Sequence, residues 1–446
     1  MGDRYIIDFM SLSTIGRSFA SRNYQLFFLG QSLSLLGNWI TKTTILWLAY
    51  DLTHSPLFLG LIGFLSQLPN LIITPFAGVI IERYQRRRVL ICTHSLSIII
   101  FLILGLLCLE NAINSRLLLG FSIVQGIVNS VVLPARQTFL GDIINQKEDI
   151  SNATALHSSL ATICRIIGPG IAGFLIVNIN AGYCFLLDGL SYIGVIIALL
   201  VMVVNPAIVE SSTTSLVTSS VTEITKQSPL GQNLQEGWSY VFNFLPIRMI
   251  LLQISAMSFL GMSYRSLLPI WATEIIKGDA TTLGYLMAAT GVGALLAALY
   301  LSAKPNVVGF EEILTFSPAI FGVTLVIFCF VNNWFVSLFL MAIIGGASLL
   351  VSSASNALLQ TISEEGKRGR VMSFYTMGMG GILPLGELFM GGLTQGIGVT
   401  YALMISGCGC MVIAILSAIN LPTLQDAIRP IYIKNGLLSK DILIRE

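Results

Sequence analysis

The sequence predicts an all-α polytopic membrane protein with about twelve transmembrane helices in two six-helix bundles. Hydrophobic residues make up 54% of its 446 residues and charged residues only 10%, whereas a soluble domain is roughly a quarter charged. The mean hydropathy is +0.83. The apolar residues come in long runs and not in the alternation typical of a transmembrane β-barrel. Such a chain cannot be covered by water, so its helices are expected to lie in a bilayer.

A bilayer-spanning helix needs roughly 20 mostly apolar residues, and this rule gives about twelve spans. We expect them at 24–50, 57–81, 89–109, 117–140, 153–177, 183–204, 249–274, 282–302, 312–331, 335–359, 370–395 and 399–420. One long Ser- and Thr-rich interruption separates the sixth span from the seventh. The expected organisation is an N-terminal segment 1–23, a first bundle 24–204, a central loop 205–248, a second bundle 249–420 and a tail 421–446.

Basic residues mark one side of the membrane. Clusters at 86–88 and 367–370 follow the second and tenth spans, whereas the opposite loops hold little beyond Arg116 and Lys277. Because cytoplasmic loops collect Lys and Arg, both termini and the central loop are expected in the cytoplasm. The 86–88 cluster is then a topology anchor, and no nucleic-acid partner is expected.

The residues that usually mark catalytic or metal sites are scattered. The seven cysteines lie mostly inside or at the ends of spans, and the three histidines are far apart. We therefore expect free thiols, no metal site and no cofactor. No nucleophile–base pair or phosphate-binding loop stands out, so an enzyme is not expected.

The two bundles carry weak matches in the same order. Leu59-Gly60 aligns with Leu283-Gly284, Gly126 with Gly346, and Pro169 with Pro384. Each match is feeble alone, but their common order indicates a duplication into two parallel halves.

Polar side chains at helical spacing mark a pathway through the spans. Groups that hydrocarbon cannot solvate should face a cavity or another helix, although Ser and Thr can also serve helix packing. Lys42 and Arg265 each lie about two-thirds of the way out along the first helix of their half, so they can be partners across one cavity. Asp188 is either a proton site or an interfacial or salt-bridged residue, and Glu387 either carries a proton or neutralises a nearby arginine. The expected pathway residues are Asn38, Lys42, Gln125, Asn129, Arg165, Asp188, Arg265 and Glu387.

Glycine and proline recur in spans 5 and 11. They remove side-chain bulk and bend helices, which suits close packing and also rocking of one half against the other. The expected helix-packing residues are Gly168, Pro169, Gly170, Gly173 and Pro384.

The segment from Gly78 to Arg87 resembles the loop signature of the major facilitator superfamily. It departs from that signature at Glu82, where Asp is usual, and at Gln85, where Gly is usual. The resemblance implies a latch between the halves at the cytoplasmic face, to which we add Arg136 near the same end. The expected gate residues are Gly78, Glu82, Arg83, Arg86, Arg87 and Arg136.

Further motifs narrow the resemblance. Residues 168–173 are similar to the span-5 motif of proton-coupled drug exporters, but Ser122 stands where a coupling arginine is usual in span 4. Segments 133–137, 152–156 and 184–188 look like the enterobactin-exporter and macrolide-efflux branch. The branch implies export of a siderophore or antibiotic-like compound, with protons as the coupling ion.

These observations predict a secondary transporter in a bacterial cytoplasmic membrane that works by alternating access. We expect it to be a monomer. Cationic side chains outnumber carboxylates in the spans, which favours an anionic, siderophore-like substrate exchanged for protons. One alternative is a macrolide or multidrug efflux pump with a broad apolar cavity, supported by Phe27, Trp39 and Trp47. A remote alternative is a non-transporting membrane sensor or enzyme.

Overall fold

The computed structural model describes residues 17–144, 149–202, 240–364 and 366–438. Every regular element in these ranges is helical. Most of the expected N-terminal segment and of the central loop lies outside the described residues.

The first half consists of six continuous helices. Polar side chains begin several of them, as when Asn114 accepts a hydrogen bond from the backbone N–H of Leu117 and Asn180 accepts one from Gly182. A short 3-10 turn at Arg17–Ala20 precedes them. The helices are α2 (Arg22–Thr53), α3 (Pro56–Arg83), α4 (Arg86–Leu109), α5 (Ser115–Ile143), α6 (Asp149–Asn178) and α7 (Ala181–Val201).

The second half differs because two of its helices change type along their length. The span expected at 249–274 is a chain of short pieces, and the span expected at 370–395 contains one π-helical turn. The first consists of α10 (Leu245–Ala256), the π-helix η2 (Met257–Gly261), the 3-10 helix η3 (Met262–Leu267), α11 (Leu268–Ile270) and the π-helix η4 (Trp271–Ile275). The second consists of α15 (Arg368–Thr376), the π-helix η5 (Met377–Gly381) and α16 (Leu383–Ile397). The continuous helices are α12 (Ala280–Ser302), α13 (Phe310–Phe328), α14 (Trp334–Ile362) and α17 (Val399–Lys434).

Helix α17 runs past residue 420, where the last span was expected to give way to the tail. Leu424, Ile428 and Tyr432 recur at helical spacing and are buried against the second half. Their burial supports the extension of the helix to Lys434.

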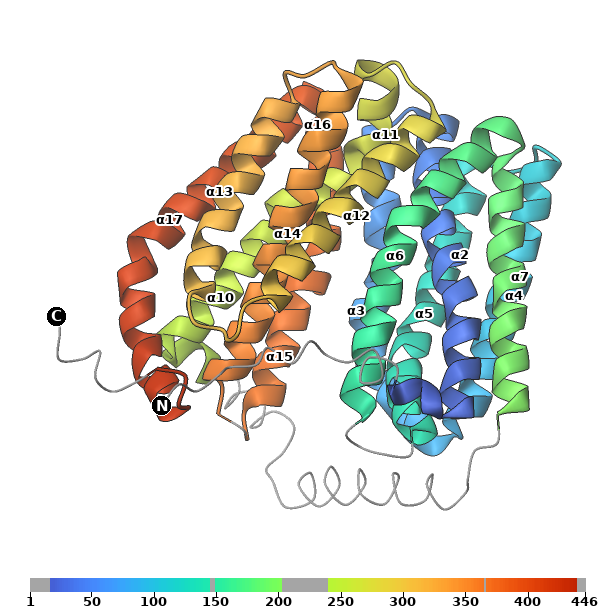
Figure 1. The fold of residues 1–446 in the computed structure, drawn as a ribbon. Helices are drawn as coiled ribbons and strands as arrows, with labels where there is room; N and C mark the ends of the chain where they lie inside the picture. The colour runs from blue at the N-terminus through green and yellow to red at the C-terminus, as the bar shows by residue number, and fades with distance from the viewer. Residues whose placement is uncertain (1–16, 145–148, 203–239, 365, 439–446) are drawn as a thin grey trace, which may run out of the picture.

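Ten helices of the described residues are long and apolar enough to cross a membrane. Helix α2 and the α15–α16 segment run alongside them (Figure 1). Helix α2 carries the polar stripe that includes Lys42, which lowers its hydropathy. The predicted class, an all-α membrane protein with two helical bundles, is confirmed.

The two halves pack mainly through α6 against α12 and through α3 against α16. We call the end where α2 begins and α17 finishes the terminal end, and the opposite end the far end. Figure 1 shows the halves close together at the far end and diverging toward the terminal end. Recorded hydrogen bonds between the halves lie from mid-helix to the far end.

Candidate substrate and proton site

Asp188 lies in the core of the first half, where α7 packs against α2. Its side chain is fully buried, and its Oδ1 accepts a hydrogen bond of 3.3 Å from Ser191. The carboxylate lies directly against Gly37, where any Cβ would collide with it. Its Oδ2 is buried and has no hydrogen-bond partner among the described residues. Asp188 is therefore an interior group of the bundle, deeper than its place near the start of span 6 indicates.

Lys42 interacts with charged groups of both halves. Its ammonium group is 5.0 Å from the centre of the Trp39 ring, a cation–π contact. It interacts electrostatically with Asp188 and with Arg265 of the other half. The partnership of Lys42 and Arg265 across one space stays a prediction.

Two guanidinium groups approach the same space. Arg165 of α6 donates a hydrogen bond of 3.4 Å to the carbonyl of Thr290 in α12 and so bridges the halves. Arg265 belongs to η3, between the two π-helical turns. The Nε atoms of both arginines are buried without a partner in the described residues. Buried donors of this kind are costly unless a ligand or water satisfies them.

Glu387 joins the second half to the first. Its carboxylate lies against Gly63 of α3, where a Cβ would collide with it. It interacts electrostatically with Arg265, although no ion pair with it is recorded in the described part of the chain. Glu387 therefore lies at the contact between α3 and α16.

The remaining predicted pathway residues form a network in the first half. Gln125 donates to Ser97 at 3.3 Å and to Asn129 at 3.4 Å. Asn38 lies at the side chain of Tyr192, which also interacts with Asp188. These contacts bring Asn38, Gln125 and Asn129 onto the inner faces of their helices.

Sequence reasoning missed His94 and Tyr192. Their rings stack at 5.1 Å, and neither ring nitrogen of His94 has a partner in the described residues. The signal was available, because Tyr192 follows Asp188 by one helical turn and His94 precedes Ser97 by three residues.

The predicted gate residues make contacts within the first half. Arg86 pairs with Asp142 at the end of α5, and Arg87 donates 2.8 Å to the carbonyl of Leu200. Arg136 donates 3.5 Å to Gln31 in α2. Arg83 is exposed, and the surroundings of Gly78 and of the Glu82 side chain are outside the described part. A latch between the halves stays a prediction.

The glycine and proline motif divides between two interfaces. A Cβ at Gly168 would lie 2.6 Å from Cβ of Trp39 in α2, within the first half. At Gly173 it would lie 2.7 Å from Cα of Thr281 in α12, and the Pro169 carbonyl packs on α12 as well. Gly170 faces open space, so close packing does not require it. Pro384 is buried at the start of α16.

The far end is held by polar contacts that the sequence did not predict. Tyr50 donates a hydrogen bond of 2.6 Å to Glu274 across the halves. Ser55 donates to Gln395 at 3.2 Å. These contacts join the two halves at the far end.

A group of charged side chains, which we call the central cluster, results from these positions. Its four cations and two carboxylates leave it positive when all are ionised. The members are Lys42, Arg136, Arg165, Asp188, Arg265 and Glu387.

Comparison with known proteins identifies the family. The profile of the transmembrane secretion effectors, a family of the major facilitator superfamily, matches residues 17–439. The chain belongs to this family. It is therefore a membrane transporter and not an enzyme, with a small-molecule substrate and the lipid bilayer as partners.

Several relatives are similar over most of the transporter. A staphyloferrin A transporter of Staphylococcus aureus is 26% identical over 87% of this chain and 94% of that protein. The multidrug efflux pump Tap of Mycolicibacterium fortuitum is 23% identical over 87% and 93%. Macrolide efflux protein A of Streptococcus pyogenes is 21% identical over the same shares. Among solved structures, the nucleoside transporter NupG covers 89% of this chain and 97% of its own, with a TM-score of 0.67 and 12% identity.

Proposed function

We propose that the transporter exports a small anionic compound of the siderophore type across the bacterial cytoplasmic membrane. The positive balance of the central cluster carries this proposal. An anion between the halves would satisfy the buried Nε–H groups of Arg165 and Arg265 and would face Lys42. The similarity to a staphyloferrin A transporter supports the class of compound. The description of the family as secretion effectors supports the direction.

Exchange for protons is the second part of the proposal. Asp188 and Glu387 are carboxylates within spans, and such groups commonly mark proton routes. Each lies at a helix contact opened by a glycine, Gly37 or Gly63. Expelling a monoanion while admitting a proton moves two charges in the direction that an inside-negative potential favours. The potential then contributes about 4.6 kcal/mol per 100 mV.

Alternating access and topology complete the proposal. Tyr50 and Glu274 join the halves at the far end, and the halves diverge toward the terminal end (Figure 1). The charge asymmetry of the loops supports a cytoplasmic location for both termini. This arrangement would then load substrate from the cytoplasm. The monomer is the proposed transporting unit, because one chain supplies the whole central cluster.

The test compares a strain lacking this gene with its parent, grown with and without iron. Mass spectra of medium and cell extract are expected to reveal an acidic metabolite trapped in mutant cells, chiefly under iron limitation. Identical spectra would contradict siderophore export. Uptake of the identified compound into inverted vesicles, with the pH gradient and the potential imposed separately, then tests proton exchange.

A macrolide or multidrug exporter is the second candidate, supported by the similarity to Tap and to macrolide efflux protein A. The aromatic residues expected to line a broad apolar cavity are dispersed. Phe27 packs on Phe139 in the core of the first half at 6.0 Å, and Trp39 lies beside Lys42. Competition among chemically unrelated drugs for efflux would favour this candidate over the anion exporter.

A further inference from the structure

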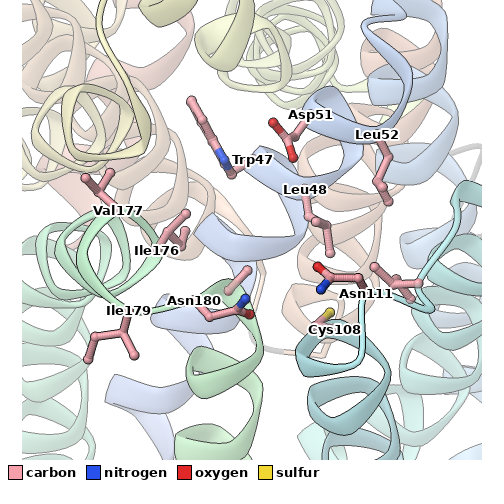
Figure 2. Close-up of a pocket in the computed structure, with 12 residues that line it drawn as sticks. Trp47, Leu48, Asp51, Leu52, Cys108, Asn111, Ile176, Val177, Ile179 and Asn180 are labelled. Carbon is pink, nitrogen blue, oxygen red and sulfur yellow. The ribbon is translucent and has the colours of Figure 1, made fainter.

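A pocket of about 410 Å³ opens in the first half at the far end, apart from the central cluster. It lies where α2 ends, where α4 passes into the following loop, and where α6 turns into α7 (Figure 2). Its volume is within the range of small-molecule sites, about 300–1,000 Å³. Neither the predicted pathway nor the proposed export cycle uses this space.

The charge of this far pocket is opposite to that of the central cluster. Asp51 is the one residue among those lining the pocket that carries a formal charge at neutral pH. No ion pair or hydrogen bond of its carboxylate is recorded among the described residues. Figure 2 shows the carboxylate at the edge of the shared space, one helical turn from Trp47. An anion would be repelled here, whereas a cation would gain a partner.

The other lining residues combine apolar walls with polar groups. The indole of Trp47 offers a ring face for a cation–π contact, and Leu48, Leu52 and Ile176 supply apolar walls. A metal ion fits poorly, because hard cations need several oxygen ligands and one carboxylate is present. In the part of the chain that the structure describes, no group of three potential metal ligands occurs.

Two carboxamides add polar contacts without adding charge. Asn111 has a left-handed backbone, with φ of 52°, at the end of α4, a conformation that Asn tolerates better than most residues. Asn180 uses its Oδ1 to cap α7 through the Gly182 N–H at 2.7 Å, which leaves its Nδ2 for other contacts. Both side chains border the pocket in Figure 2.

We propose that the far pocket is a binding site for an organic cation with a bulky apolar body. Asp51 neutralises the charge, Trp47 stacks on the cationic group or on its ring substituents, and the aliphatic walls bury the remainder. The site is separate from the anion pathway, so its test does not depend on the proposed function.

The measurement is equilibrium binding of tritiated tetraphenylphosphonium to the purified full-length protein in phosphatidylcholine nanodiscs, with empty nanodiscs as the blank. Saturable binding is expected. Asp51→Asn and Trp47→Ala are each expected to weaken it about threefold to fivefold, because each removes one partly exposed contact of the cation. Tetraphenylborate, which has the same shape and the opposite charge, is expected to bind no better to wild type than to Asp51→Asn.

Two conservative variants in the far pocket and one variant in the central cluster serve as controls. Asp51→Glu and Trp47→Phe retain the charge and the ring, so they are expected to keep most of the affinity. Lys42→Gln alters the central cluster and is expected to leave the affinity for tetraphenylphosphonium unchanged. Absence of saturable binding, equal affinities of wild type and Asp51→Asn, or a change caused by Lys42→Gln alone would overturn the proposal.

Discussion

The two halves share a six-helix plan but differ in which polar groups they bury and in how regular their helices are. The first half has continuous helices around a polar interior that includes His94, Gln125 and Asp188. In the second half the buried polar side chains are mostly serines and threonines, and three π-helical turns interrupt two of its helices. π-Helical turns occur often at functional sites, and here they flank Arg265 and precede Glu387. Titratable groups are thus concentrated in one half and irregular helices in the other.

The terminal ends of the halves differ in a parallel way. In the first half Arg86 at the start of α4 pairs with Asp142. In the second half Glu311 at the start of α13 accepts a hydrogen bond of 3.0 Å from Tyr432 of the extended helix α17. An ion pair thus stabilises the start of α4 in the first half, and a hydrogen bond from a neutral hydroxyl stabilises the start of α13 in the second half. The contribution of each contact to the stability of the protein can be measured.

Neutralising Lys42 and Arg265 together should produce the largest effect. Each change removes a charged contact to an anion, worth about 1.5–3 kcal/mol, so transport of acids should fall at least a hundredfold in the double variant. Neutral compounds should be affected much less. Initial rates in vesicles for a matched acid and its methyl ester would measure the difference. Equal losses of transport rate for the acid and its ester would contradict an electropositive site shared by the halves.

Asp142→Asn should have the next largest effect, on stability. It leaves the Arg86 guanidinium without its buried counter-charge, and breaking a buried pair costs about 3–5 kcal/mol. Asp149→Asn is the matched control, because its partner Arg17 is 53% exposed and such pairs contribute about 0–1 kcal/mol. Thermal unfolding in detergent would compare them. Similar losses of stability in both variants would mean that the buried Arg86–Asp142 pair contributes no more than the exposed Arg17–Asp149 pair.

Tyr432→Phe should lower the stability of the protein less than Asp142→Asn does. It removes the hydroxyl that bonds the buried Glu311 carboxylate and also lies 3.2 Å from the Val307 carbonyl oxygen. The expected cost is about 1.5–3 kcal/mol, and the ring packing stays intact. The same unfolding measurement applies, with the exposed Tyr401→Phe as control. A larger loss of stability in Tyr432→Phe than in Asp142→Asn would mean that the neutral hydrogen bond stabilises the protein more than the ion pair does.

Much of this architecture could be predicted from the sequence, because hydropathy and helical spacing report local properties. The expected spans coincide closely with the helices, and α2 indeed carries Lys42 on a polar stripe. The π-helical turns could not be predicted, since glycines such as Gly378 and Gly381 are compatible with an ordinary bent helix. The extension of α17 depends on burial of Leu424 and Ile428 against other helices, which local hydropathy does not report.

The site was predicted as a set of residues but not as an arrangement. Charge within a span identified Lys42, Asp188 and Glu387, because hydrocarbon tolerates few such groups. The glycines that accommodate the two carboxylates, Gly37 and Gly63, became evident only once distant helices were placed side by side.

Tyr50→Phe should have the smallest effect and tests whether polar contacts hold the far end closed. The variant loses one hydrogen bond to Glu274 across the halves, worth about 0.5–1.5 kcal/mol. The population with an open far end should therefore rise about twofold to tenfold, measured by electron–electron distances between spin labels on α3 and α16. Thr93→Val, which removes a hydroxyl bonded to carbonyls of its own helix α4, is the control and should leave the distances unchanged. Unchanged distances in Tyr50→Phe would mean that glycine-mediated packing of α3 on α16 and of α6 on α12 closes the far end, so that regular helix contacts and not side-chain hydrogen bonds join the two unlike halves.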